Sequence, residues 1–293
     1  MNGMTPFRFD ELERAYLIAE IGINHNGDVE IARRLMDMAC LAEWDCVKFQ
    51  KRDPDRCVPN DQRDLLRDTP WGRMTYLEYR RRLEFNKTQY HSLWKHAGER
   101  IAATASVWDE NSVDFMLSLP TCFLKIPSAH LTNDDLIRYV CRHGAPILLS
   151  TGMSTLEEVD HAVELLQSAS DNFAIMHCHS SYPAAEAELN LRVVPVFIER
   201  YGCVVGYSGH EFGLSTTVAA VALGARIIER HVTLKRTMWG TDQMASVEPH
   251  GMLKLAAHIR ALESSLGDGH KRLYDSELPA RRRLRGAVEA CHA

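Results

Sequence analysis

At 293 residues the chain is long enough for one large domain or two ordinary ones, and it can bury a substantial core. Hydrophobic residues make up 45% of it and charged residues 25%, which is typical of a soluble globular protein. The net charge of −5 gives no electrostatic reason to expect nucleic acid or an anionic membrane as partner. Any site for an anion therefore has to concentrate positive charge locally.

The eight cysteines are scattered, with neither a CxxC pair nor zinc-like spacing. Several stand in apolar runs, such as Cys46 in "CVKFQ" and Cys203 in "CVVGY", where cysteine packs as a small hydrophobe. The N-terminus is polar and acidic, unlike a signal peptide, and no apolar run approaches the roughly 18 residues that a membrane span needs. We expect reduced thiols in a cytoplasmic protein.

Short apolar, β-branched runs alternate with amphipathic segments along the chain. Strands are expected at residues 15–23, 46–50, 101–107, 123–128, 146–151, 173–180, 204–209 and 226–233. A helix is expected after each strand, at residues 29–43, 87–97, 110–119, 133–143, 155–168, 190–200, 214–224 and 249–266. "STLEEV" predicts a capping box of Ser154 and Glu157. Asn133, followed by two aspartates that suit the positive end of a helix dipole, marks another helix start. Gly144 and Gly224 mark helix ends.

Eight strand–helix units in about 250 residues predict an α/β fold, a single-domain (β/α)8 TIM barrel. A doubly wound open sheet is the alternative, but the first βα turn lacks a GxGxxG fingerprint. We expect an N-terminal extension at 1–14, the barrel at 15–266 and a basic C-terminal tail at 267–293. Residues 51–86 form a long insertion after the second strand, a typical place for a loop over an active site.

Polar side chains gather at the predicted carboxyl ends of the strands, where barrel enzymes carry their catalytic residues. These residues are Glu20, Lys48, Gln50, Ser106, Lys125, Ser128, Ser150, Thr151, Ser180, Ser208, His210, Glu229 and His231. Lysines and hydroxyls bind phosphate or carboxylate oxygens, so they supply the local positive charge that the net balance lacks.

Two histidines, His210 and His231, end neighbouring predicted strands. Either one alone is best interpreted as a packed or backbone-bonded side chain. Together, at equivalent depths, they predict a shared divalent metal ion, with Glu20 and Glu229 nearby. Two histidines make an incomplete tetrahedral zinc site, so they suit a weakly held ion of higher coordination, completed by water and substrate.

Several motifs run in order through nearly the whole predicted barrel. They include "AEIGINHNG" (19–27), "VKFQ" (47–50), "KIPSAHLTN" (125–133), "ILLSTGMSTLEEV" (147–159), "HCHSSYP" (177–183), "VGYSGH" (205–210) and "IERHVTL" (228–234). Each motif alone is a weak signal, but the ordered combination resembles the sialic acid synthase family. Members of that family condense phosphoenolpyruvate with an N-acyl amino sugar, such as N-acetylmannosamine, to give a nine-carbon 2-keto-3-deoxy acid and phosphate.

The resemblance implies a role for most of the candidate residues and adds Asp242 and Tyr182 to them. The family's metal-binding histidines correspond to His210 and His231, which implies a divalent cofactor, Mn²⁺ before Mg²⁺ or Co²⁺. Its phosphoenolpyruvate-binding groups correspond to Lys48, Ser106, Lys125, Ser128, Ser150 and Ser208. Its catalytic and sugar-contacting acids correspond to Glu20, Glu229 and Asp242, and Gln50 and Tyr182 line the sugar pocket. The implied partners are the two substrates and a second copy of the chain in a homodimer, without nucleic acid or membrane.

The sequence departs from the family pattern in four places. Gly209 stands where the family usually has Asp, Trp108 belongs to a changed third-strand end, and "WGTDQ" (239–243) keeps Asp242 but loses a histidine. The resemblance also does not extend to the small C-terminal antifreeze-like domain of typical members. That domain donates an arginine to the sugar's N-acyl group across a dimer, so we expect this contact to be lost unless the insertion, with Arg52, Arg56 and Arg63, or the tail replaces it.

Three other functions compete with this hypothesis. The same condensation can use a sugar without the acylamino group. A non-catalytic sugar-binding barrel fits Gly209 and the missing domain, although a binding module needs no metal and phosphate groups together. A barrel aldolase or epimerase would use Lys125 as a Schiff-base amine and would work without metal.

Overall fold

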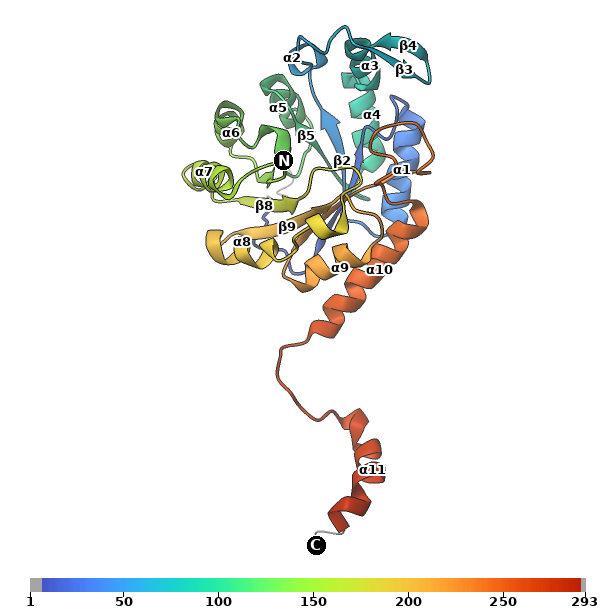
Figure 1. Ribbon diagram of the computed structural model, residues 1–293, viewed down its shortest axis with the longest axis vertical. Coiled ribbons are helices and arrows are strands. Elements are labelled where there is room, and N and C mark those ends of the chain that lie inside the picture. Colours follow the sequence, from blue (N-terminus) through green and yellow to red (C-terminus); the bar gives the residue numbers. More distant parts are fainter. Residues whose placement is uncertain (1–6, 291–293) are drawn as a thin grey trace.

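A computed structural model describes residues 7–290 of the chain, and the side chains of residues 7–285. Eight parallel strands close into a barrel in the order β1-β10-β9-β8-β7-β6-β5-β2, with helices around it (Figure 1). The strands are β1 (Tyr16–Gly22), β2 (Cys46–Lys51), β5 (Ala102–Val107), β6 (Leu124–Ile126), β7 (Ile147–Ser150), β8 (Phe173–Cys178), β9 (Val204–Gly209) and β10 (Ile227–His231). The predicted TIM barrel is confirmed, and its closure excludes the doubly wound sheet.

A helix follows each strand of the barrel. These helices are α1 (Val29–Leu41), α4 (Lys87–Ala97), α5 (Glu110–Leu117), α6 (Asp134–Cys141), α7 (Leu156–Gln167), α8 (Val193–Tyr201), α9 (Ser215–Ala222) and α10 (Pro249–Leu266). Their apolar faces pack on the outward side chains of the strands, so one continuous core cluster extends around the barrel.

Strand register brings the polar residues to one level of the barrel. On β1, Glu20 is in register with His231 of β10 and with Lys48 of β2. Ser208 of β9 lies opposite Glu229 of β10 in the same way. Because neighbouring parallel strands present in-register side chains to the same side, these groups converge inside the carboxyl end of the barrel.

One predicted helix cap is wrong by one residue. Helix α7 is capped by Thr155, whose hydroxyl accepts from the backbone N–H of Glu158 at 3.3 Å, while the Glu158 carboxylate accepts from the Thr155 N–H at 2.8 Å. The Ser154 hydroxyl instead donates to the carbonyl of Gly152. In "STLEEV" a Ser-Thr pair is followed by a Glu-Glu pair, so two capping boxes fit the sequence equally well. The helix start predicted at Asn133 is confirmed, and the Asn133 side chain caps α6 by accepting from the backbone N–H of Leu136 at 3.1 Å.

The insertion at residues 51–86 is regular rather than an irregular loop. It contains α2 (Pro54–Cys57), a hairpin of β3 (Leu66–Thr69) and β4 (Gly72–Thr75), and α3 (Tyr76–Leu83), which lie above the barrel at the top of Figure 1. The Tyr79 ring packs edge-on against Trp239, with ring centroids 5.2 Å apart, so the insertion contacts the loop after β10.

The C-terminal segment contains a helix as well, α11 (Leu278–Ala290), which lies away from the barrel at the bottom of Figure 1. Every cysteine whose side chain is described is a free thiol. Across the described residues, none of the helices is both long enough and apolar enough to cross a membrane.

Candidate active site

The carboxyl ends of the strands surround a pocket of about 220 Å³. Every residue to which the resemblance gives a role, other than Asp242, lines it, namely Glu20, Lys48, Gln50, Ser106, Lys125, Ser128, Ser150, Tyr182, Ser208, His210, Glu229 and His231. Of the two other candidates at strand ends, Ser180 lines the pocket and Thr151 does not. A larger depression of about 590 Å³ lies at the opposite end of the barrel, bordered by Phe9, Asn172 and Arg226, and it contains none of these residues. The chemistry-bearing groups therefore converge on the smaller pocket.

Two lysines and two glutamates form a buried charge network in this pocket. Lys48 Nζ lies 2.5 Å from Glu20 Oε2 and 3.5 Å from Glu229 Oε1. Lys125 Nζ lies 2.9 Å from Glu229 Oε2. The Lys48 ammonium also donates to the Ser106 hydroxyl at 2.8 Å. All of these side chains are buried, so the two cations and two anions compensate one another inside the barrel.

The two glutamates differ in their affinity for protons. Burial raises the pKa of Glu20 above its ordinary value, and the nearby Glu229 carboxylate adds to this effect, although Lys48 opposes both. Burial acts on Glu229 in the same direction, but Lys125 and Lys48 together lower its pKa to about 2. Neighbouring carboxyl groups whose pKa values diverge in this way are candidates for an acid–base group and a permanently ionised group. Here Glu20 is the candidate acid–base group.

The serine hydroxyls around the charge network differ in their hydrogen-bond partners. The Ser208 hydroxyl donates to Glu229 Oε1 at 3.2 Å. The Ser128 hydroxyl accepts from the backbone N–H of Gly152 at 3.0 Å and lies 3.2 Å from the thiol of Cys178. Donors and acceptors of this kind beside two lysines suit the oxygens of a phosphate or carboxylate.

The two predicted metal ligands, His210 and His231, face one another across the pocket. Their ring centroids are 5.5 Å apart. His210 Nδ1 lies 2.6 Å from the carbonyl of His179, so this nitrogen carries the proton and Nε2 keeps a free lone pair. Burial, followed by the charge of His231, lowers the pKa of His210 to about 3, which leaves its imidazole neutral at neutral pH. The Tyr182 ring stacks on His210, at 4.1 Å between centroids.

The geometry fits one ion held by both imidazoles. With nitrogen–ion bonds of about 2.1 Å, two rings that share an ion have centroids at most about 6.5 Å apart, and the observed distance is shorter. His231 Nδ1 is buried and has no hydrogen-bond partner among the described residues. Within these residues no group of three or more His, Cys, Asp or Glu side chains is arranged to hold a metal, so an ion here takes its other ligands from water and substrate.

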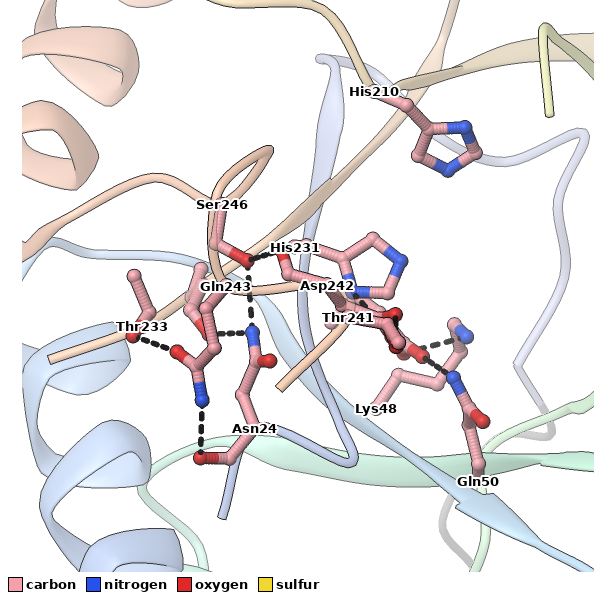
Figure 2. Close-up of polar contacts among 12 residues, drawn as sticks. Asn24, Lys48, Gln50, His210, His231, Thr233, Thr241, Asp242, Gln243 and Ser246 are labelled. Carbon is pink, nitrogen blue, oxygen red and sulfur yellow. Dashed lines mark hydrogen bonds and ion pairs between the residues drawn. The ribbon is translucent and has the colours of Figure 1, made fainter. Parts of the chain in front are cut away.

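Asp242 lies beside His231 rather than in the pocket lining, with its Oδ2 3.8 Å from His231 Nδ1 (Figure 2). The Ser246 hydroxyl donates to the Asp242 carbonyl at 2.7 Å and accepts from the Asn24 amide at 2.8 Å. The Gln243 amide donates to the Asn24 carbonyl at 3.1 Å and its oxygen accepts from Thr233. A buried hydrogen-bond network therefore holds the loop that carries Asp242 against the end of β1.

The space beside Gly209, where the family usually has an Asp side chain, is occupied by the carboxylate of Glu211. A Cβ atom at Gly209 would lie 2.7 Å from Glu211 Oε2 and 2.9 Å from Oε1, so the Glu211 carboxylate already fills that space. Glu211 forms a fully buried ion pair with Arg230, at 3.1 Å between Oε1 and Nη1. Burial opposes ionisation, but Arg230 and hydrogen bonds hold the pKa of Glu211 below its ordinary value.

Sequence reasoning missed the supporting residues of this site. Trp108 lines the pocket, and its indole Nε1 is buried without a hydrogen-bond partner among the described side chains. Gln243 stands where the family pattern has a histidine, and it is fully buried in the network of Figure 2. Asn24 carried a usable signal because it lies inside the motif "AEIGINHNG", directly after a strand end.

The chain is similar in sequence and in structure to several known proteins. Residues 35–271 match the NeuB family. The chain is 36% identical to the human N-acetylneuraminate-9-phosphate synthase over 279 residues, which cover 94% of this chain and 77% of that protein. It is 34% identical to the N,N'-diacetyllegionaminic acid synthase of Legionella pneumophila over 296 residues, covering 98% and 83%. The crystal structure of N-acetylneuraminic acid (sialic acid) synthetase from Leptospira borgpetersenii, in complex with citrate, superimposes with a TM-score of 0.81 at 29% identity and covers 93% of each chain.

Proposed function

Because the chain belongs to the NeuB family, we propose that it condenses phosphoenolpyruvate with a sugar aldehyde, an N-acylated hexosamine, to give a sialic-type nine-carbon acid and inorganic phosphate. One observation carries this proposal: two buried lysines, a set of hydroxyls and two facing imidazoles line a single pocket. Anion-binding groups and a carbonyl-activating centre are what the two substrates need at the point where they meet.

In this proposal the chain's own groups hold phosphoenolpyruvate and activate water. Lys48, Lys125 and the surrounding serines bind the phosphate and carboxylate, which turns C3 of phosphoenolpyruvate toward the aldehyde carbon. A carbon–carbon bond forms between these atoms, the aldehyde oxygen takes up a proton, and C2 becomes electron-poor. Glu20, whose pKa is raised by burial, accepts a proton from the water that adds at C2. The resulting hemiketal phosphate releases inorganic phosphate as the C2 carbonyl forms.

We propose that His210 and His231 hold a divalent ion, Mn²⁺ before Mg²⁺ or Co²⁺. When bound, the ion supplies Lewis-acid polarisation of the aldehyde oxygen. The neutral imidazole of His210, fixed by the carbonyl of His179, and the unpaired Nδ1 of His231 support this assignment. The Glu229 carboxylate stays ionised between the two lysines and keeps both of them in place.

The decisive experiment measures phosphate released from phosphoenolpyruvate, with and without a hexosamine aldehyde, before and after chelation of divalent metal. We expect release only when both the aldehyde and the metal are present. Unchanged turnover after chelation contradicts the metal assignment. Trapping of a Lys125 adduct by borohydride favours the Schiff-base aldolase, and absence of release with every aldehyde favours the non-catalytic sugar-binding barrel.

A further inference from the structure

The insertion above the pocket buries more positive charge than its carboxylates compensate. Arg52, which follows β2, and Arg80, on α3, each expose only 7% of their surface. We call these two residues the arginine pair. A buried guanidinium cannot relieve its cost by losing a proton, because arginine stays protonated in proteins. Burial and the charge of Arg80 lower the pKa of Arg52 to about 10, which still leaves Arg52 charged at neutral pH.

A single glutamate, Glu84, pairs with two of the three cations here. Glu84 Oε2 lies 3.1 Å from Lys51 Nζ, and Glu84 Oε1 lies 3.7 Å from Arg52 Nε. Within the described residues, Arg80 makes no hydrogen bond or ion pair, and its aromatic contact is with Tyr76, 6.0 Å from the ring centroid. The cluster of Lys51, Arg52, Arg80 and Glu84 therefore carries an excess of two positive charges.

Another nearby carboxylate, Asp109, is occupied elsewhere. One of its oxygens accepts from the backbone N–H of Ser112, and the other accepts from the backbone N–H of Asp53, the Ser112 hydroxyl and the Cys57 thiol. It makes no ion pair with the arginine pair in the described part of the chain. The excess charge is therefore left for a group from outside the chain.

The arginine pair is joined to the pocket through two of its lining residues. Arg52 Nη2 donates to Gln50 Oε1, and the Arg52 guanidinium lies over the Trp108 ring, 3.9 Å from its centroid. Gln50 in turn donates to Glu20 Oε1 at 3.3 Å. The pocket, at about 220 Å³, is smaller than the roughly 300–1,000 Å³ typical of small-molecule sites. We infer that two substrates need more room than this volume and that part of the second one lies toward the mouth of the pocket.

We propose that the arginine pair binds the phosphate group of a phosphorylated sugar aldehyde, at the end of the sugar remote from the reacting aldehyde. This inference rests on the proposed function and narrows its acceptor to a hexosamine 6-phosphate. A phosphate dianion matches the two excess charges, and two guanidinium groups match its oxygens through paired N–H donors. Phosphoenolpyruvate adds three carbons at the aldehyde, so the acceptor's phosphate becomes the 9-phosphate of the product.

The first test compares kcat/KM for N-acetylmannosamine and its 6-phosphate in the unmodified protein, in Arg80→Met and in Arg81→Met. We expect the unmodified protein to prefer the phosphorylated sugar at least tenfold, and Arg80→Met to reduce that preference by about 10- to 100-fold. Arg81 is the matched control, because it lies on the same helix, is exposed and pairs with Asp55. Its substitution should leave the preference unchanged, whereas Arg80→Lys should restore part of it.

A second test measures binding without turnover, by calorimetry with sorbitol 6-phosphate and sorbitol at saturating phosphoenolpyruvate. Sorbitol 6-phosphate has no aldehyde, and phosphoenolpyruvate fills the other phosphate-binding groups. We expect sorbitol 6-phosphate to bind at least tenfold more tightly than sorbitol. This result would support phosphate binding by the arginine pair even if condensation itself is not observed. Equal binding of the two, or an equal substrate preference in unmodified protein and a folded Arg80→Met, overturns the inference.

Discussion

The buried ion pair of Glu211 and Arg230 lies directly beside both proposed metal ligands, since Glu211 follows His210 and Arg230 precedes His231. Arg230 also donates to the Thr217 hydroxyl at 2.7 Å and to the Glu211 carbonyl at 2.6 Å. Each side chain is therefore held by several charge-assisted hydrogen bonds in a water-excluded site.

Replacement of Glu211 by Ala leaves the Arg230 guanidinium buried and uncompensated. Removing one partner of such a pair costs about 3–5 kcal/mol in the free energy of unfolding. The hydroxyls of Tyr207, Thr216 and Thr217, which donate to Glu211 at 2.8–2.9 Å, lose their acceptor too, so we expect a value toward the upper end. Arg230→Met with Glu211→Leu removes both charges and should restore most of the stability.

Urea unfolding, followed by circular dichroism, measures this loss directly. The control is Asp160→Ala, which breaks the exposed pair with Arg200 and should change stability little. A loss below about 1 kcal/mol for Glu211→Ala would refute the reasoning. So would a double variant that is as unstable as the sum of the Glu211→Leu and Arg230→Met single variants.

Three further outcomes are expected. His231→Ala should abolish phosphate release while its circular dichroism spectrum stays native; activity near the unmodified level would contradict the metal assignment. Gly209→Ala should lower the melting temperature, because its Cβ would lie 2.7 Å from Glu211 Oε2. Asp109→Asn should cost about 1–3 kcal/mol. Hydrogen bonds from Asp53 and Ser112 outweigh burial and lower the pKa of Asp109, so its stabilisation is present above the unfolded-state pKa of about 3.9 and should disappear in urea titrations as the pH falls below that value.

The barrel was predictable from sequence because its strands are short, apolar and regularly spaced. The site residues were predictable too, because Lys48, Lys125 and His231 each follow a buried apolar run. Closure of the barrel brings the carboxyl ends of such strands together. Local patterns failed where two neighbouring choices are chemically equal, as with Ser154 and Thr155 at the start of α7.

The rest of the site depends on contacts between segments that are distant in sequence. Gln243 bonds to Asn24 across 219 positions, and no local pattern predicts such a pair. Gly209 was interpreted as the loss of a carboxylate, because a sequence motif is compared with the family position by position. In space the carboxylate of Glu211, two residues later, occupies the volume above Gly209. The consequence of a departure from a motif therefore depends on which atoms occupy the same volume in the folded structure.

The buried lysines of the pocket and the arginine pair differ in how their positive charge is compensated. Lys48 and Lys125 each have a carboxylate within 3.0 Å, so the pocket is electrically balanced before any substrate arrives. Arg80 has no such partner among the described residues, and Arg52 shares one with Lys51. An anion that enters the pocket has to compete with Glu20 and Glu229 for the two lysines. An anion that binds the arginine pair instead supplies negative charge that the cluster lacks. Anion binding should therefore stabilise the insertion more than it stabilises the barrel wall.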